Sequence, residues 1–243
     1  MRIIFSRKGF DSASGGGPSP IIDGRPVSLP IPASVSTGVS YASLGMETMV
    51  ENASKGRVCA EMPCHYDPLF TSQGTCLFGQ VGAAQTHLAN HKIRTGDVFL
   101  FFGLFREKQE KPHHRIFGYL RIEEIVPLHE CPEEKLRFFA DQGHPHALSP
   151  LGNNDTIYCG PGTTAAHASP ALRLTAQDTK PSLWAIPSWL KHTGLSYHHK
   201  PERWLRGNRL QSVARGQEFV ANIGRRKTPR EWLKTIIKEI EAT

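Results

Sequence analysis

Two histidine-containing segments carry the residue types that acid–base chemistry needs. In CHYDP (64–68), His65 and Asp67 are two residues apart, so their side chains point the same way on an extended strand. A carboxylate beside an imidazole orients it and favours its charged form, as in a general-base pair. His144 and His146 have the same spacing, with Pro145 keeping the backbone extended, which suits metal ligation or phosphate contact. The structural alternatives are a turn with a packed His65 and a loop around His144.

A third candidate site lies at the N-terminus, where an apolar strand RIIF (2–5) runs into cations and then into flexible backbone. Consecutive backbone amides can form an anion-binding nest, and glycines let a phosphate approach closely. Asp11 is a candidate proton carrier beside this loop. Neither a Walker spacing nor a dinucleotide fingerprint is present, and a plain solvent loop is the alternative. The predicted phosphate-binding residues are Arg7, Lys8, Ser12, Gly15, Gly16, Gly17 and Ser19.

Other motifs offer weaker chemistry. In GQVGAAQTHL (79–88), Gln80, Gln85 and His87 could hydrogen-bond a base edge, or simply pack a Gly/Ala-rich turn onto a helix. An imidazole next to a cysteine can activate the thiolate, as His65 next to Cys64 would. Adjacent residues on a strand point to opposite faces, however, which argues against this pair. The cysteine and histidine spacings match no common zinc finger, and GxSxG does not occur. We therefore expect no metal site and no serine triad, and the cofactor is left unknown.

The C-terminal third is strongly basic. Residues 191–230 contain ten lysines and arginines, against Glu202 and Glu218 as acids. Clustered arginine is what neutralisation of nucleic-acid phosphates requires, although a solvated basic surface has the same composition. Membrane-surface binding is a further alternative. The predicted contacts to a nucleic-acid backbone are Arg203, Arg206, Arg209 and Arg215.

Composition places these candidates in a turn-rich protein of 243 residues. It has 22 Gly and 18 Pro, which favours strands and loops over a helical bundle, and a net charge of +7, which favours polyanionic partners such as nucleic acid or nucleotides. Five unevenly spaced cysteines argue against a secreted disulfide scaffold. The N-terminal apolar run is too short for a signal peptide, and the longest apolar stretch (98–105) is too short to span a bilayer. We expect a cytoplasmic location.

The elements that must position the candidate residues follow from local patterns. Residues 9–38 are rich in Gly, Pro and Ser and predict irregular structure. The runs 96–106 and 115–126, separated by a charged turn, predict a hairpin. Helices are expected at 43–55 and 132–141, and a C-terminal helix should begin at Thr228 with a Thr-x-x-Glu capping box. With no repeat or linker visible, residues 1–243 predict one α+β domain with a mixed or antiparallel, partly barrel-like sheet.

The opening segment resembles a known family. FSRKGFDSASGGGPSPI (5–21), with LPIP at 29–32, is similar to the start of the nucleotide-modification-associated domains, third family. Less specific likenesses continue at CHYDPLF, GQVGAAQTHL, GDVFLFFGLFR, HPHALSP and PSLWAIPSWL, across nearly the whole chain. This resemblance implies a role in modifying nucleic-acid bases in prokaryotes or their phages, without specifying a reaction. The hairpin at 96–126 is also similar to the central strands of PUA-like barrels, including ASCH and EVE domains, which bind modified bases or RNA.

These observations favour an enzyme of the transferase class that acts on a nucleotide or on a base in nucleic acid. In this interpretation Arg7 and Lys8 hold phosphate, and Asp11 or the His65/Asp67 pair moves the proton. The alternative is a non-catalytic, PUA-like reader of modified bases in DNA or RNA. A third possibility is a subunit that works with partner proteins of a modification system.

Overall fold

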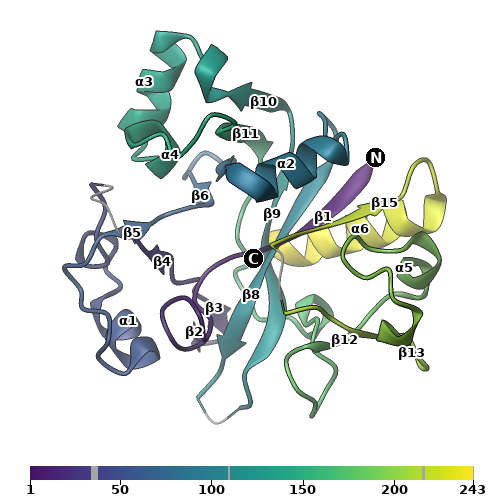
Figure 1. Cartoon of the computed structure of the whole chain (residues 1–243). Coiled ribbons are helices and arrows are strands. Elements are labelled where there is room, and N and C mark those ends of the chain that lie inside the picture. The colour runs from purple at the N-terminus through teal and green to yellow at the C-terminus, as the bar shows by residue number, and fades with distance from the viewer. Residues whose placement is uncertain (34–37, 109, 215–216, 243) are drawn as a thin grey trace.

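The computed structural model describes residues 1–33, 38–108, 110–214 and 217–242 (Figure 1). The α-helices are α1 (Glu47–Ser54), α2 (Gly82–Asn90), α3 (Glu133–Asp141), α4 (Pro145–Leu148), α5 (Ser188–Thr193) and α6 (Lys227–Glu241). The strands of the N-terminal half are β1 (Arg2–Arg7), β2 (Ser19–Ile22), β3 (Arg25–Pro26), β4 (Ile31–Pro32), β5 (Cys64–His65), β6 (Leu69–Phe70), β7 (Thr75–Gln80), β8 (Val98–Arg106) and β9 (His113–Arg121). Those of the C-terminal half are β10 (Glu124–Pro127), β11 (Thr156–Pro161), β12 (Leu183–Ala185), β13 (Trp204–Leu205), β14 (Arg209–Gln211) and β15 (Glu218–Asn222).

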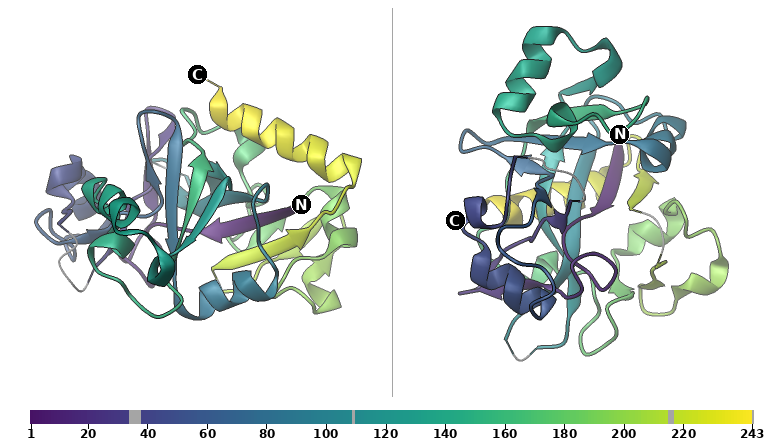
Figure 2. Two further views of the ribbon diagram at one scale, coloured as in Figure 1. Left: turned by 90° about the horizontal axis from the view of Figure 1, so that it is seen from above. Right: turned by 60° about the vertical axis from the view of Figure 1, so that its left-hand side comes forward.

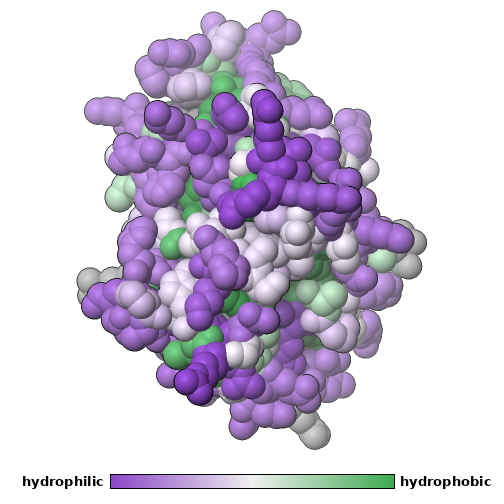
Figure 3. All heavy atoms as spheres, turned by 90° about the vertical axis from the view of Figure 1, so that its right-hand side faces the viewer, coloured by the Kyte–Doolittle hydropathy of each residue, from purple (hydrophilic) through white to green (hydrophobic). Residues whose placement is uncertain are grey.

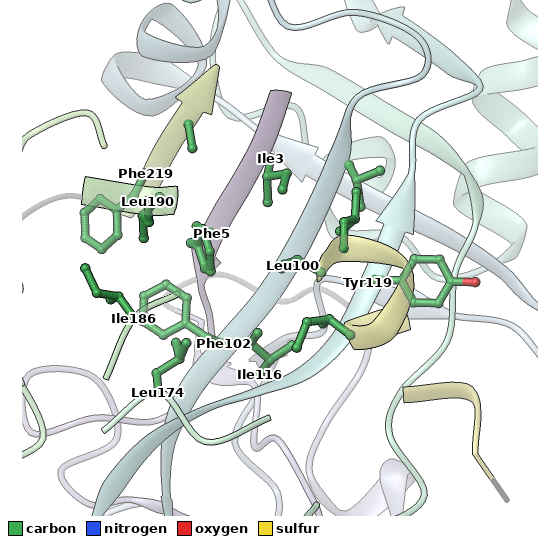
Figure 4. Close-up of a cluster of buried hydrophobic side chains, with 14 of the residues drawn as sticks. Ile3, Phe5, Leu100, Phe102, Ile116, Tyr119, Leu174, Ile186, Leu190 and Phe219 are labelled. Carbon is green, nitrogen blue, oxygen red and sulfur yellow. The ribbon is translucent and has the colours of Figure 1, made fainter. Parts of the chain in front are cut away.

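The largest sheet is mixed and is buried on both faces. Its order is β15-β1-β8-β2-β3, with β9 paired to β8; β1 runs parallel to β8 and antiparallel to β15. Successive side chains alternate between two cores, so Ile3 and Phe5 pack on one face and Ile4 on the other. Figure 4 shows the first core, in which β1 and β8 meet side chains from the C-terminal third. Burial on both faces explains the unbroken apolar runs at 3–5 and 98–102.

Helices cover the two faces of this sheet. Leu233, Ile236 and Ile240 of α6 belong to the core that contains Ile3, whereas Leu88 of α2 belongs to the core that contains Ile4. The left panel of Figure 2 shows α6 and α2 on opposite sides of the central strands. The C-terminal residues thereby fix the position of β1, whose last residue, Arg7, belongs to the candidate site predicted at the N-terminus.

Three smaller sheets complete an α+β architecture. They are β10-β11-β7-β6, β12-β14-β13 and the pair β4-β5. The predicted α+β class with mixed and antiparallel sheets is confirmed, and no sheet of the described residues closes into a barrel. The PUA-like architecture stays a prediction.

Most predicted elements are present. The hairpin is confirmed as β8 and β9. Its second strand is shorter than expected, because residues 124–127 form the separate strand β10, which pairs with β11. The helices expected at 43–55 and 132–141 are confirmed as α1 and α3. No helix of the described residues is long and apolar enough to cross a membrane. No disulfide joins the five cysteines, all of which lie in the described part of the chain.

Two predictions of local structure are wrong. Residues 9–38 include the strands β2, β3 and β4, because Ser19 and Pro20 extend the sheet beside the far end of β8, beyond the residues that β1 pairs. The C-terminal helix begins at Lys227 with Arg226 as N-cap, so Thr228 is not the cap. The turn before the helix is stabilised instead by two arginine side chains. Arg226 donates a hydrogen bond to the carbonyl of Ile223, and Arg230 donates one to the carbonyl of Gly224.

Candidate functional site

The principal cavity has a volume of about 560 Å³ and lies at the carboxyl end of β1. Its walls come from the ends of β1 and β7, the pair β4-β5, helix α4 and the segment before β15, which can be located in Figure 1. Cavities of roughly 300–1,000 Å³ are typical of sites for small ligands. Predicted site residues that line it are Arg7, Lys8, Asp11, His65, Asp67, Gln80 and His146.

His65 and Asp67 are brought together as the sequence predicted, but through a turn. Strand β5 ends at His65, and the amide of Asp67 donates to the carbonyl of His65 at 2.9 Å. The Nε2 atom of His65 lies 3.8 Å from Oδ2 of Asp67, whose side chain is 3% exposed. The other carboxylate oxygen, Oδ1, accepts the amide of Gly79 at 2.9 Å. The carboxylate is thus held by β7 while it faces the imidazole.

Burial and neighbouring charges set the protonation states of this pair. Burial lowers the pKa of His65 to about 4, against the opposing effect of Asp67, so the imidazole is neutral at pH 7. Burial alone would raise the pKa of Asp67, but contact with His144 and the charges of His146 and His65 lower it to about 2. At neutral pH the site therefore combines an ionised carboxylate with a neutral imidazole, which is able to accept a proton.

His144 and His146 join the same cluster, but not on an extended strand. His144 is the N-cap of α4, and His146 lies within this short helix, because Pro145 starts a helical turn there. The expectation of an extended backbone is therefore wrong. The rings of His65 and His146 have centroids 5.1 Å apart, and Nε2 of His144 lies 3.4 Å from Oδ1 of Asp67. Two segments 79 residues apart in sequence thus form one cluster, to which Asp155 adds a hydrogen bond from Nδ1 of His146.

The expectation of no metal site rested on cysteine spacing, and the structure presents a different set of donors. One ligand atom from each of His65, Asp67 and His146 lies within 4.8 Å of the others. Cys64, the other metal or nucleophile candidate, is fully buried, and burial raises the pKa of its thiol to about 11. A reactive thiolate at Cys64 is not favoured.

Lys8 is positioned by an ion pair with a buried acid. Its Nζ lies 3.2 Å from Oε1 of Glu218 and 4.3 Å from the centre of the Phe78 ring. The same Oε1 accepts hydrogen bonds from Ser6 at 3.0 Å and from Gln80 at 2.8 Å. This Glu218 network connects the central sheet to β7 of the second sheet, and it holds Lys8 and Gln80 at the cavity wall.

Arg7 also lines the cavity, and its guanidinium is hydrogen-bonded to backbone carbonyls. Its terminal nitrogens donate to the carbonyls of Ala214 at 2.8 Å and Val213 at 3.0 Å. Burial lowers the pKa of Arg7, while Asp11 opposes the shift. Ala214 and Gln217 line the cavity, so Arg7 holds one of its walls.

The three consecutive glycines Gly15, Gly16 and Gly17 do not line the cavity, although Asp11 before them does. Oδ1 of Asp11 accepts the amides of Ala13 and Ser14, each at 2.8 Å, in the manner of an Asx turn. Gly15 and Gly16 have φ of +86° and +88°, and a Cβ on either would meet Phe10 or Arg57. A Cβ on Gly17 would lie 2.0 Å from the carbonyl oxygen of Ala53. The three glycines permit close packing against Phe10, Arg57 and α1, and they are not among the residues that line the cavity.

The remaining predicted ligand contacts lie elsewhere. Ser12 is exposed, and the buried Ser19 accepts the amide of Leu29 at 3.1 Å. Gln85 accepts the hydroxyl of Tyr158 at 2.9 Å, and His87 lies 3.0 Å from the hydroxyl of Ser196. None of these four residues lines the principal cavity.

The basic segment surrounds the hairpin β13-β14. Arg206 and Arg209 are exposed there, whereas Arg203 is half-buried and donates to the carbonyl of Gln211 at 3.2 Å. Arg215 lies outside the described residues. Figure 3 shows that the face on the right of Figure 1 is mainly hydrophilic, with only small hydrophobic patches. Two of the four predicted phosphate contacts are thus available to solvent.

Sequence reasoning missed two buried acids at the site. Glu218 was counted only as a charge opposing the basic segment, and Asp155 was not singled out. Both side chains are 1% exposed. Both acids could have been found from the sequence, because each directly precedes or begins an apolar strand, in EFVA (218–221) and DTIY (155–158). An acid at such a position is expected to be buried and to need a partner.

Comparison with known proteins agrees with the resemblance of the opening segment. No curated protein and no solved structure matches the chain. The family model described as nucleotide modification associated domain 3 matches residues 2–222, from the first strand through the last strand of the central sheet. The match therefore includes every residue of the cavity wall, and the chain belongs to the family of nucleotide modification associated domain 3.

Proposed function

We propose that this protein is an enzyme that modifies a base of a nucleotide or of a nucleic acid in the principal cavity. The family supports involvement in nucleotide modification. The observation that carries the catalytic part is the His65–Asp67 pair in the cavity wall, with an ionised carboxylate 3.8 Å from a neutral imidazole. Titratable groups with strongly shifted pKa values in a cleft are candidates for catalysis.

In this proposal the imidazole of His65 accepts a proton from the substrate, and Asp67 stabilises the resulting imidazolium. The carboxylate is suited to this role because the amide of Gly79 fixes one of its oxygens. A nucleobase that loses a proton from a ring or exocyclic nitrogen becomes a better nucleophile. Transfer of a group to that nucleobase requires such a nucleophile. His65 is 22% exposed, so the ring is accessible from the cavity.

The phosphate-bearing part of the substrate would lie at the Arg7–Lys8 side of the cavity. Both residues line the wall, and a cation at that position attracts a phosphate. Arg7 mainly stabilises the cavity wall, through its hydrogen bonds to the carbonyls of Val213 and Ala214. The flexible ammonium group of Lys8 would make the contact to the phosphate. For a nucleic-acid substrate, Arg206 and Arg209 would contact the backbone outside the cavity.

Nucleoside mass spectrometry of DNA and RNA tests the proposal, in cells that carry the gene and in cells that lack it. A mass change that requires the gene and disappears with Asp67→Asn supports the enzyme. His129→Gln is the matched control, because that side chain is 58% exposed and lies outside the cavity. Identical nucleoside profiles with and without the gene, together with binding of a modified oligonucleotide, would support the PUA-like reader instead.

A further inference from the structure

We propose that His65, Asp67 and His146 bind a divalent transition-metal ion at the wall of the principal cavity. Their ligand atoms lie within 4.8 Å of one another, and they come from β5, the turn after it and α4. Donors around a tetrahedral ion at about 2.1 Å lie roughly 3.4 Å apart. The three side chains would therefore need to move together by about 1 Å, which small rotations of the two imidazoles provide.

Asp155 supplies an independent argument for a ligating role of His146. Its carboxylate accepts a hydrogen bond from Nδ1 of His146, and its other oxygen accepts the amide of Leu151 at 2.9 Å. Metal-binding histidines commonly donate their second ring N–H to a carboxylate, which fixes the tautomer and the ring orientation. Because Asp155 engages Nδ1, the Nε2 atom of His146 is left to bind the ion.

His144 points to the same place. Its side chain is fully buried, its Nδ1 has no hydrogen-bond partner among the described residues, and its Nε2 meets Oδ1 of Asp67 without the geometry of a regular hydrogen bond. Buried polar groups without partners are rare in folded proteins and call for an explanation. Its Nε2 lies 3.4 Å from Oδ1 of Asp67, beside the proposed ligand. An N–H at Nε2 of His144 would stabilise the carboxylate of Asp67 through Oδ1. An ion bound to Oδ2 of Asp67 would leave Oδ1 available for this contact with His144.

The donor set and its surroundings indicate the kind of ion. Two imidazoles and one carboxylate favour ions such as Zn²⁺, Fe²⁺ or Co²⁺ over Mg²⁺ and Ca²⁺, which prefer oxygen ligands. Three protein ligands also leave coordination positions open, and all three residues line the cavity. A ligand in the cavity would reach the ion directly, as at catalytic rather than structural metal sites.

This inference does not rest on base modification: with the ion bound, His65 and Asp67 act as ligands instead of as an acid–base pair, and ion binding is measurable without a substrate. The protein is treated with a chelator, dialysed and titrated with Co²⁺, whose visible absorption reports coordination, and with Mg²⁺ for comparison. We expect one equivalent of Co²⁺ to bind, Zn²⁺ to displace it, and Mg²⁺ to have no effect at the same concentration.

Variants assign the site. His65→Gln, Asp67→Asn and His146→Gln should each weaken Co²⁺ binding about 100-fold or more, and Asp155→Asn should weaken it about tenfold as a positioning residue. The control is His91→Gln, because His87 and His91 form a second imidazole pair with ring centroids 4.2 Å apart. Circular dichroism of each metal-free variant establishes that it is folded; His65→Gln, at a partly exposed side chain, should be the least disruptive.

Two results would overturn the inference. One is the absence of Co²⁺ and Zn²⁺ binding to the folded wild-type protein. The other is binding that is lost with His91→Gln but retained in a folded His65→Gln variant. Either result leaves the base-modification proposal standing, because His65 and Asp67 could then act as an acid–base pair without a metal.

Discussion

The side-chain amide of Gln80 donates to the carboxylate of Glu218 at 2.8 Å, although 138 residues separate them in the sequence. Gln80 ends β7, and Glu218 begins β15. The same carboxylate oxygen lies 3.2 Å from the ammonium group of Lys8. One buried acid therefore joins two sheets and places a cation at the wall of the cavity.

Glu218→Gln should lower the free energy of unfolding by about 3 kcal/mol, because it removes the buried member of the ion pair and leaves the largely covered ammonium of Lys8 without its counter-charge. The Lys8→Met/Glu218→Gln double variant should lose less than the sum of the two single changes. Urea unfolding of the four proteins measures this coupling. Glu133→Gln is the control, since its ion pair with Arg137 is exposed and should contribute no more than about 1 kcal/mol. Additive losses in the double variant would contradict the role given to the Glu218 network.

Asp11→Asn should retain binding and turnover, because an asparagine oxygen can accept the amides of Ala13 and Ser14 as the carboxylate does. Asp11→Ala removes that acceptor and should destabilise the protein by about 1 kcal/mol. Nucleoside mass spectrometry and thermal unfolding of both variants separate the two effects. Loss of turnover in a stable Asp11→Asn protein would transfer the catalytic role from His65 and Asp67 to Asp11.

The half-buried His114 predicts a loss of stability in acid. Burial lowers the pKa of His114 to about 3, and its Nδ1 accepts a hydrogen bond from the Trp184 indole at 3.0 Å. Between its unfolded value of 6.5 and this folded value, the unfolded state binds more protons, so stability falls as the pH falls. The contribution of His114 is complete above pH 6.5 and decreases below it by up to about 1.4 kcal/mol per pH unit.

Urea unfolding at several pH values checks this prediction. His114→Asn keeps an acceptor near the indole and removes the titration, so its stability should fall less steeply below pH 6.5 than that of the wild type. His129→Gln, at an exposed position, should leave the slope unchanged. Equal slopes for the wild type and His114→Asn would show that His114 is protonated as easily in the folded as in the unfolded protein.

Sequence patterns predicted the parts of this protein that depend on local order. The apolar runs at 3–5 and 98–105, the hairpin and the C-terminal helix are such cases, because alternation and helical spacing express burial directly. The His65–Asp67 pair was also predicted, since its two members are near neighbours in the chain. The convergence of His146 and Asp155 on that pair depends on how α4 docks beside β7, and no local pattern records such a contact. Glu218 was overlooked for the same reason, because its partners Ser6, Lys8 and Gln80 come from other strands.

The basic hairpin predicts a salt-dependent contact with nucleic acid. If Arg206 and Arg209 each neutralise one phosphate, replacing both by Ala should reduce the slope of log K against log salt by about 2 on duplex DNA. Their exposed side chains should leave the thermal midpoint nearly unchanged. Arg203→Ala should affect stability as well, because its guanidinium bonds the carbonyl of Gln211.

Oligonucleotide binding measured at several salt concentrations decides between a phosphate contact and a solvated surface. The control is Arg137→Ala on α3, an exposed arginine outside the basic segment that should leave the slope unchanged. A slope that is the same for the wild type and for the Arg206→Ala/Arg209→Ala double variant would leave this segment without a role in binding.

The most direct test of the central claim uses extract from cells that lack the gene, supplemented with purified protein and a nucleic-acid substrate. The extract supplies whatever co-substrate or partner the reaction requires, and the mass of the released nucleosides is measured. We predict a mass change with the wild type and with His129→Gln, and none with a folded Asp67→Asn variant. The same mass change with Asp67→Asn would contradict the assignment of the His65–Asp67 pair as the catalytic centre.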